Sequence, residues 1–169
     1  KTLGIQSEIR IAPYNQVFQQ LLEGGMLRMN RGGVNLVALD LDAWLPEGSI
    51  SEALPKLDRA ITDLFSVLRA SASGGAGGAI LIFPLIEASG ERADAVSAAK
   101  ARIVQESESI AGWSAVDLAG AAKLYEVGEA RDPFTDELGN IPFTEDLYVA
   151  AAAAAARWIR CACAKPKKV

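Results

Sequence analysis

The chain has 169 residues, of which 50% are hydrophobic and 22% are charged, a balance that suits one globular domain with a substantial core. Its net charge of −4 gives no global attraction to nucleic acid or to acidic membranes. Because the chain contains no histidine, it cannot build a Ser-His-Asp or Cys-His nucleophilic site, or a zinc site of the usual His/Cys kind.

The first half of the chain alternates short apolar runs with segments of helical periodicity. We expect a strand over Ser7–Ala12 and then a helix from Tyr14 to about Asn30, interrupted at Gly24-Gly25. The run Val34–Leu41 is nearly all apolar, which is typical of a strand that is buried on both faces. A capping box at Ser49–Glu52 then opens a helix whose apolar residues form a single stripe.

The same order continues after a glycine-rich loop over residues 70–78. Ala79–Ile86 predicts a third strand, and a helix follows from about Glu91 to Ala111. Trp113–Leu118 predicts a fourth strand.

The last part of the chain is expected to be mostly helical. A short helical segment is predicted around residues 121–125, and the acidic stretch Glu129–Asn140 is expected to be a loop. Thr144 is expected to cap a final helix that runs to about Cys163. Cys161 and Cys163 would diverge on this helix, so they predict neither a disulfide nor a metal site.

Strands that alternate with crossover helices predict a three-layer α/β/α sandwich with a mainly parallel sheet. The chain starts directly on a strand, and residues 165–169 stop where a new apolar run would begin. We therefore expect one α/β domain over residues 1–164 and the start of a linker over 165–169. No apolar run is long enough to cross a membrane and the first residues do not resemble a signal peptide, so we expect a cytoplasmic protein.

In such folds, ligands bind at the carboxyl ends of the strands. The residues that follow the predicted strands are Pro13–Gln16, Asp40–Trp44, Glu87–Ser89, and Asp117 together with Arg131–Asn140. This set could form a polar pocket, but it contains no obvious nucleophile–base pair. Tyr14, Asn15 and Gln16 would lie in the first turn of a helix, where free N–H groups and side-chain amides could hold an anion or a carbonyl. The alternative is that Tyr14 is packed and the amides are solvated.

The sequence Leu39-Asp-Leu-Asp42 closes an apolar strand, as a DxD motif does in phosphatases of the haloacid dehalogenase type. In those enzymes the first aspartate attacks phosphorus, the second acts as acid and base, and Mg²⁺ offsets the charge. Here Ala43–Pro46 replaces the usual Thr or Val and glycine-rich turn. A Mg²⁺-dependent phosphatase that uses Asp40 and Asp42 is therefore one hypothesis, and two acids that begin a loop are the alternative.

Several stretches together carry a family resemblance. They are Ile11–Leu22, Asn30–Val37 leading to Asp42-Ala-Trp44, Asp136–Thr144, and Arg157–Arg160 followed by Lys165–Val169. With them the chain resembles the N-terminal domain of FkbH-like proteins. Those proteins supply glyceryl units, from a phosphoglycerate, to acyl carrier proteins in polyketide and nonribosomal peptide assembly lines.

The resemblance implies a fold similar to SGNH hydrolases and flavodoxins, followed after Val169 by a haloacid-dehalogenase-type (HAD-like) domain. Glyceryl-transfer and phosphatase chemistry would belong to that second domain, and Asp40 and Asp42 would lie outside it. The family also has a strand and helix upstream of the position of Lys1, so the first strand of the sheet would be missing here. Asn140 stands where the family commonly has histidine, and an amide cannot act as a base.

The resulting hypothesis is a non-catalytic, SGNH-like accessory domain. It would hold an acyl carrier protein or its phosphopantetheine arm, or orient the adjacent HAD-like domain, and would bind neither nucleic acid nor membrane. We expect no metal and no cofactor in this domain; Mg²⁺ enters only under the phosphatase hypothesis. A structural spacer or dimerisation module is a further alternative. The expected pocket rim consists of Tyr14, Asn15, Gln16, Asn30, Asn35, Asp42 and Asn140.

Overall fold

The computed structural model describes residues 8–13, 16–22, 25–30, 32–45, 49–72, 77–84 and 90–163. Within these ranges, three parallel strands form one sheet in the order β1-β2-β3. The strands are β1 (Val34–Leu39), β2 (Gly77–Ile82) and β3 (Trp113–Asp117). The predicted mixed α/β architecture with a parallel sheet is confirmed. Because the three strands run in the same direction, their carboxyl ends meet at one edge of the sheet.

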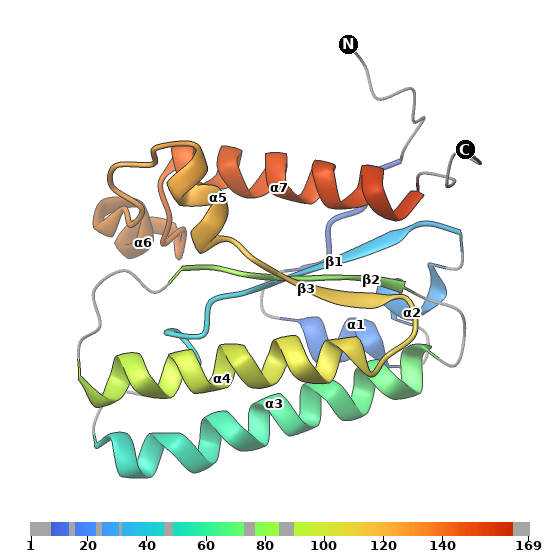
Figure 1. The fold of residues 1–169 in the computed structure, drawn as a ribbon, viewed down its shortest axis with the longest axis horizontal. Coiled ribbons are helices and arrows are strands. Elements are labelled where there is room, and N and C mark those ends of the chain that lie inside the picture. The colour runs from blue at the N-terminus through green and yellow to red at the C-terminus, as the bar shows by residue number, and fades with distance from the viewer. Residues whose placement is uncertain are drawn as a thin grey trace, which may run out of the picture.

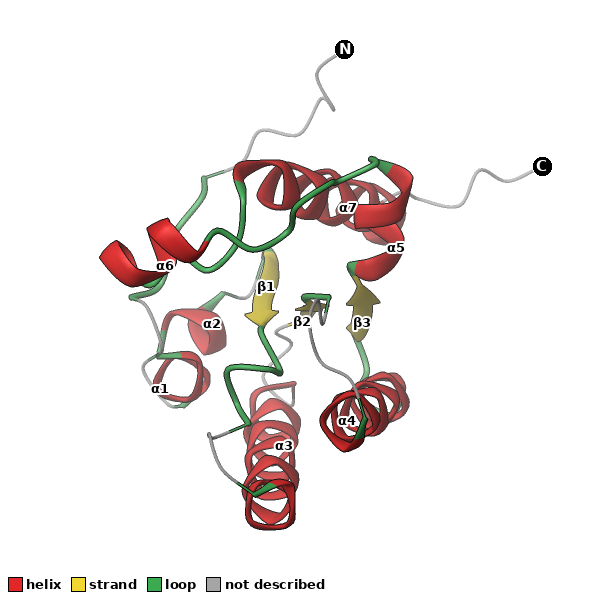
Figure 2. Ribbon diagram, turned by 90° about the vertical axis from the view of Figure 1, so that its left-hand side faces the viewer, coloured by secondary structure: helices red, strands yellow, loops and turns green. Residues whose placement is uncertain are grey.

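Helices lie on both sides of this sheet (Figures 1 and 2). On one side, α3 (Ile50–Ala72) connects β1 to β2, and α4 (Glu91–Glu108) connects β2 to β3. On the other side lie α5 (Ala119–Leu124) and the long α7 (Glu145–Cys163). None of the helices in the described part of the chain is both long and apolar enough to cross a membrane.

The core forms two clusters, one on each face of the central strand. Ile80 and Ile82 belong to the cluster shared with α3 and α4, whereas Ala79 and Leu81 belong to the cluster shared with α7. Successive residues of a strand point to opposite faces, so β2 needs apolar side chains at every position. This is why its sequence is a continuous apolar run.

The amino-terminal segment differs from the prediction. Glu8–Pro13, the described part of the region expected to contain the first strand, forms no strand, and Ile9 and Ile11 are 83% and 86% exposed. Alternating isoleucines predict a strand only where a neighbouring strand supplies hydrogen bonds and cover, and no neighbour lies beside this segment in the described residues.

The helix expected from Tyr14 to Asn30, with an interruption at Gly24-Gly25, consists of two short helices, α1 (Val17–Leu21) and α2 (Met26–Met29), which Gly25 separates as expected. Leu22 is extended after α1, and Gly25 is extended before α2. The backbone of Gly25 lies so close to the carbonyl of Gln20 that a Cβ atom would overlap it. The glycine therefore permits a sharp break, which the Gln20 side chain supports by accepting a 3.0 Å hydrogen bond from the Met26 N–H.

The acidic stretch expected to be a loop contains α6 (Pro133–Gly139), which lies beyond the carboxyl edge of the sheet (Figure 1). Asp132 caps the helix by accepting hydrogen bonds from the N–H groups of Phe134 and Thr135, and Pro133 fits the first turn. Asn140 ends the helix in the left-handed conformation, with φ 52° and ψ 44°. The prediction of a loop was wrong because it gave more weight to polar composition than to these two capping signals.

Thr144 lies before α7, as predicted, and its Oγ1 accepts a long hydrogen bond (3.5 Å) from the Leu147 N–H. Three alanines of this helix are buried, Ala150, Ala151 and Ala155. Their small side chains allow α7 to lie close to the sheet.

An ion-pair cluster of Arg69, Arg102 and Glu106 joins α3 to α4. Arg69 and Arg102 each donate a 2.7 Å hydrogen bond to the Glu106 carboxylate. Burial raises the pKa of Glu106, but the hydrogen bonds and charges of the two arginines outweigh this, so its pKa lies below the ordinary value of 4.5.

We expect Glu106→Gln to lower the free energy of unfolding by about 1 kcal/mol at pH 7. A depressed carboxylate pKa stabilises the fold above the unfolded-state pKa, and that contribution is lost as the pH falls through the folded-state value. The difference between variant and wild type should therefore shrink below pH 4.5. Urea unfolding at pH 7 and at acidic pH measures this difference in unfolding free energy. The control is Glu108→Gln, at an exposed position. A difference that does not change with pH would contradict this assignment.

Candidate functional site

Two aspartates and two arginines meet at the carboxyl edge of the sheet. Asp40 and Asp42 directly follow β1, Arg92 lies in the first turn of α4, and Arg131 lies between α5 and α6. The Nη2 atom of Arg131 donates to Asp40 Oδ2 and to Asp42 Oδ2, at 3.2 Å in each case. Arg92 Nε donates to Asp42 Oδ1 at 2.8 Å. Two positive and two negative charges thus compensate one another.

Local backbone contacts fix this ion cluster. Asp40 Oδ1 accepts a 3.1 Å hydrogen bond from the Asp42 N–H, which turns the chain at the end of β1. Arg92 Nη2 also donates to the carbonyls of Asp42 and Leu45, both at 3.1 Å. Arg92 therefore anchors the loop after β1 to α4, and the cluster has a structural role whatever else it does.

The same geometry bears on the DxD hypothesis. In a two-aspartate phosphatase site, the first carboxylate attacks phosphorus, the second transfers a proton, and Mg²⁺ offsets the charge. Here the Arg131 guanidinium instead lies within hydrogen-bond distance of one oxygen from each aspartate. The arrangement of Asp40 and Asp42 therefore fits an internally paired ion cluster better than a nucleophile and its acid–base partner. Among the described residues, no three Asp, Glu, His or Cys side chains gather as metal ligands do.

An aromatic cluster lies directly against the ion cluster. The Phe83 and Phe143 rings stack at a centroid distance of 4.4 Å with an interplanar angle of 6°. The Tyr148 ring meets both rings edge-on at 6.0 Å. The Arg131 guanidinium lies over the Phe143 ring, with its Cζ atom 5.2 Å from the ring centroid. Phe143 therefore supports Arg131 by cation–π attraction while it packs in the core.

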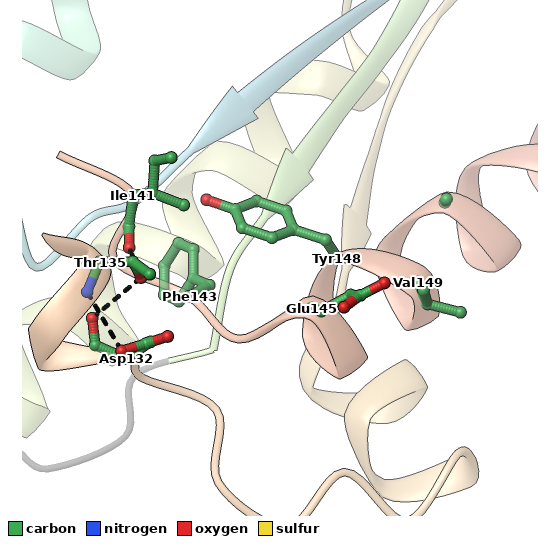
Figure 3. Close-up of a pocket in the computed structure, with 8 residues that line it drawn as sticks. Asp132, Thr135, Ile141, Phe143, Glu145, Tyr148 and Val149 are labelled. Carbon is green, nitrogen blue, oxygen red and sulfur yellow. Dashed lines mark hydrogen bonds between the residues drawn. The ribbon is translucent and has the colours of Figure 1, made fainter. Parts of the chain in front are cut away.

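A groove of about 480 Å³ opens beside the aromatic cluster, between the end of α6 and the start of α7 (Figure 3). The side chains of Phe143, Tyr148 and Val149 form the apolar part of its wall. The hydroxyl of Thr135 donates a 2.8 Å hydrogen bond to the Ile141 carbonyl. This bond ties α6 to the segment that leads into α7. The residues that line the groove are Asp132, Thr135, Ile141, Phe143, Glu145, Tyr148, Val149 and Ala152.

The structure brings some of the predicted rim residues to this edge. Asp42 belongs to the ion cluster, and Asn140 precedes the groove residue Ile141. Gln16 is exposed just before α1, and its side chain does not cap that helix. Tyr14 and Asn15 lie outside the described residues, as does the predicted edge segment Glu87–Ser89.

Asn30 and Asn35 lie at the opposite end of β1 from Asp42, so the structure does not bring them to the same edge. Asn35 is only 3% exposed, and its Nδ2 donates to the Leu27 carbonyl at 2.9 Å. Its Oδ1 accepts a 2.8 Å hydrogen bond from Asn30 Nδ2. The pair fastens α2 to β1, so its role is structural. The carboxyl-edge rule applies only to residues that follow a strand, whereas Asn30 precedes β1 and Asn35 is its second residue.

The sequence prediction placed Arg131 at this edge only as the first residue of the stretch Arg131–Asn140, and it missed Arg92 and the aromatic residues that define the edge. One signal was available: two aspartates that follow a buried strand need cations nearby, because an unpaired buried carboxylate is costly. The chain offers 17 lysines and arginines, so that signal alone does not select Arg92 and Arg131. Asp117, which was among the predicted edge residues, pairs with Lys100 at 3.1 Å and accepts from the Ala119 N–H.

Comparison with known proteins finds no matching protein family, no similar curated protein and no similar solved structure.

Proposed function

We propose that this chain is a non-catalytic accessory domain of an FkbH-like protein, with an SGNH-hydrolase-like or flavodoxin-like three-layer α/β/α sandwich. In this proposal it supports glyceryl transfer to an acyl carrier protein by recognising the carrier, its phosphopantetheine arm or the adjacent HAD-like domain. The parallel sheet, with helices on both sides, is compatible with that fold. The resemblance of the segments around Asn30–Val37 and Asp136–Thr144 supplies the family.

The observation that carries the non-catalytic part of this proposal is the pairing of both edge aspartates with arginine. A nucleophile or general base needs a reactive lone pair that is free to attack or to accept a proton. Arg131 contacts both Asp40 and Asp42, and Arg92 takes the second oxygen of Asp42. Asn140 supplies no base, since its amide does not titrate, and its conformation serves the end of α6.

The groove beside this edge has the properties of a binding site for a slender ligand. Small-molecule sites combine mostly apolar walls with a few placed polar groups. Here the walls of Phe143, Tyr148 and Val149 are joined by the polar side chains of Thr135 and Glu145. The uncharged amide and methylene part of a phosphopantetheine arm matches this combination.

The test is an NMR titration of isotope-labelled holo carrier protein with the full chain. We expect shifts in the holo carrier that are larger than in the apo carrier, because only the holo form carries the arm. Ala152→Trp, which fills the groove from an exposed position on α7, should remove the difference between the two forms. An absence of shifts in the carrier at high concentration would sink the carrier-binding role.

A further inference from the structure

The α6 helix exposes large apolar side chains that the proposed function leaves unused. Phe134 and Leu138 are 70% and 73% exposed, and they lie four residues apart on the same side of the helix. Beyond the helix, Ile141 and Val149 are 49% and 59% exposed and flank the groove. Single exposed apolar residues are ordinary, but two on α6 and two more on the adjoining groove, which Thr135 of the same helix also lines, indicate an interaction surface.

The same region carries the acidic excess of the chain. Residues 126–146 contain seven acidic residues and one basic residue, against 21 and 17 in the whole sequence, so the remaining residues have a net charge of +2. The one basic residue is Arg131, which is paired with Asp40 and Asp42. Glu137 on α6, and Glu145 and Asp146 in the first turn of α7, are exposed.

We propose that α6, the groove and the first two turns of α7 form a docking surface for a basic, amphipathic segment of a partner protein. Apolar residues of that segment would lie along Phe134, Leu138 and the groove, as in helix-in-groove recognition. Its lysines or arginines would face Glu137 and Glu145. Charge complementarity selects this occupant and also guides its approach to the surface.

The charge disfavours the other occupants of an exposed apolar face. A second copy docked through the same face would bring two strongly acidic surfaces together. Anionic membranes and nucleic acids would be repelled for the same reason. The proposal stands on the surface of this chain alone and does not depend on its assignment to FkbH-like proteins.

The probe is a synthetic 18-residue peptide with leucines on one helical face and lysines on the other. Fluorescence anisotropy with the full chain should give a dissociation constant on the order of 10–100 μM, which weakens as salt rises. A peptide of the same pattern with glutamates in place of lysines should bind at least about tenfold more weakly, a factor that corresponds to about 1.4 kcal/mol.

Two double variants locate the contact. Phe134→Ser with Leu138→Ser, and separately Glu137→Gln with Glu145→Gln, should each weaken peptide binding about tenfold. All four residues are exposed, so circular dichroism should be unchanged. Leu54→Ser, at an exposed position on α3, is the control and should bind as the wild type does.

No binding up to about 1 mM peptide, a limit that corresponds to about −4 kcal/mol, overturns the proposal. Equal binding of the lysine and glutamate peptides, or full binding by both double variants, overturns it as well. Peptide binding without carrier shifts would leave the docking surface standing and reject the carrier role. Carrier shifts without peptide binding would reject the docking surface and leave the carrier role standing.

Discussion

Replacing Arg131 with methionine should lower the free energy of unfolding by about 2–3 kcal/mol. The substitution keeps an apolar stem against Phe143 but removes the charge, and Asp40 then loses the arginine that pairs with it. The side chains of Asp40 and Arg131 are 16% and 23% exposed, so solvent screens the resulting imbalance only in part. Chemical denaturation followed by circular dichroism measures the change.

Arg59→Met is the control for this prediction. Arg59 pairs with Asp63 at 3.8 Å on the surface of α3, where the two side chains are 84% and 60% exposed. An exposed pair of this kind contributes less than about 0.5 kcal/mol. Asp40→Asn combined with Arg131→Met should lose less stability than the two single changes added together, since each removes the same interaction. Additive losses would show that the contact between Asp40 and Arg131 does not hold the edge together.

Phe143→Ala should have a still larger effect, about 3–4 kcal/mol of unfolding free energy. Phe143 is 4% exposed, stacks on Phe83 and lies under the Arg131 guanidinium. The change therefore opens a cavity in the core cluster beneath α7 and removes support from the ion cluster at once. Thermal and urea unfolding of the purified variant measure the loss.

The control is Phe134→Ala, the same substitution at a phenylalanine nine residues earlier in the chain. Phe134 is 70% exposed on α6, so its removal should change stability by no more than about 0.5 kcal/mol. Equal losses for the two phenylalanines would contradict the placement of Phe143 in the core and of Phe134 on the docking surface.

The central part of the fold could be predicted from the sequence because its signals are local. The apolar run of β2 and the apolar stripe of α3 each determine one element, and their alternation determines a parallel sheet. The prediction of a strand around Ile9 was wrong because the alternation of isoleucines is the same whether or not a neighbouring strand is present. The α6 helix was missed although Asp132 and Asn140 marked both of its ends.

The site could be predicted only in part, because its defining contacts are distant in sequence. The carboxyl-edge rule selected Asp40 and Asp42 correctly as neighbours at the end of β1. Their partners lie 50 residues away, from Asp42 to Arg92, and 91 residues away, from Asp40 to Arg131. No local pattern connects such positions, and the pairing decides whether the aspartates are reactive or compensated.

The measurement that tests the central claim most directly is a phosphate-release assay with a panel of phosphate esters, with and without Mg²⁺. The claim is that the carboxyl edge is a recognition surface whose aspartates are held by arginine. It predicts no Mg²⁺-dependent release by the wild type above that of a folded Asp40→Asn variant. Mg²⁺-dependent turnover that Asp40→Asn abolishes, with the fold retained by circular dichroism, would contradict it.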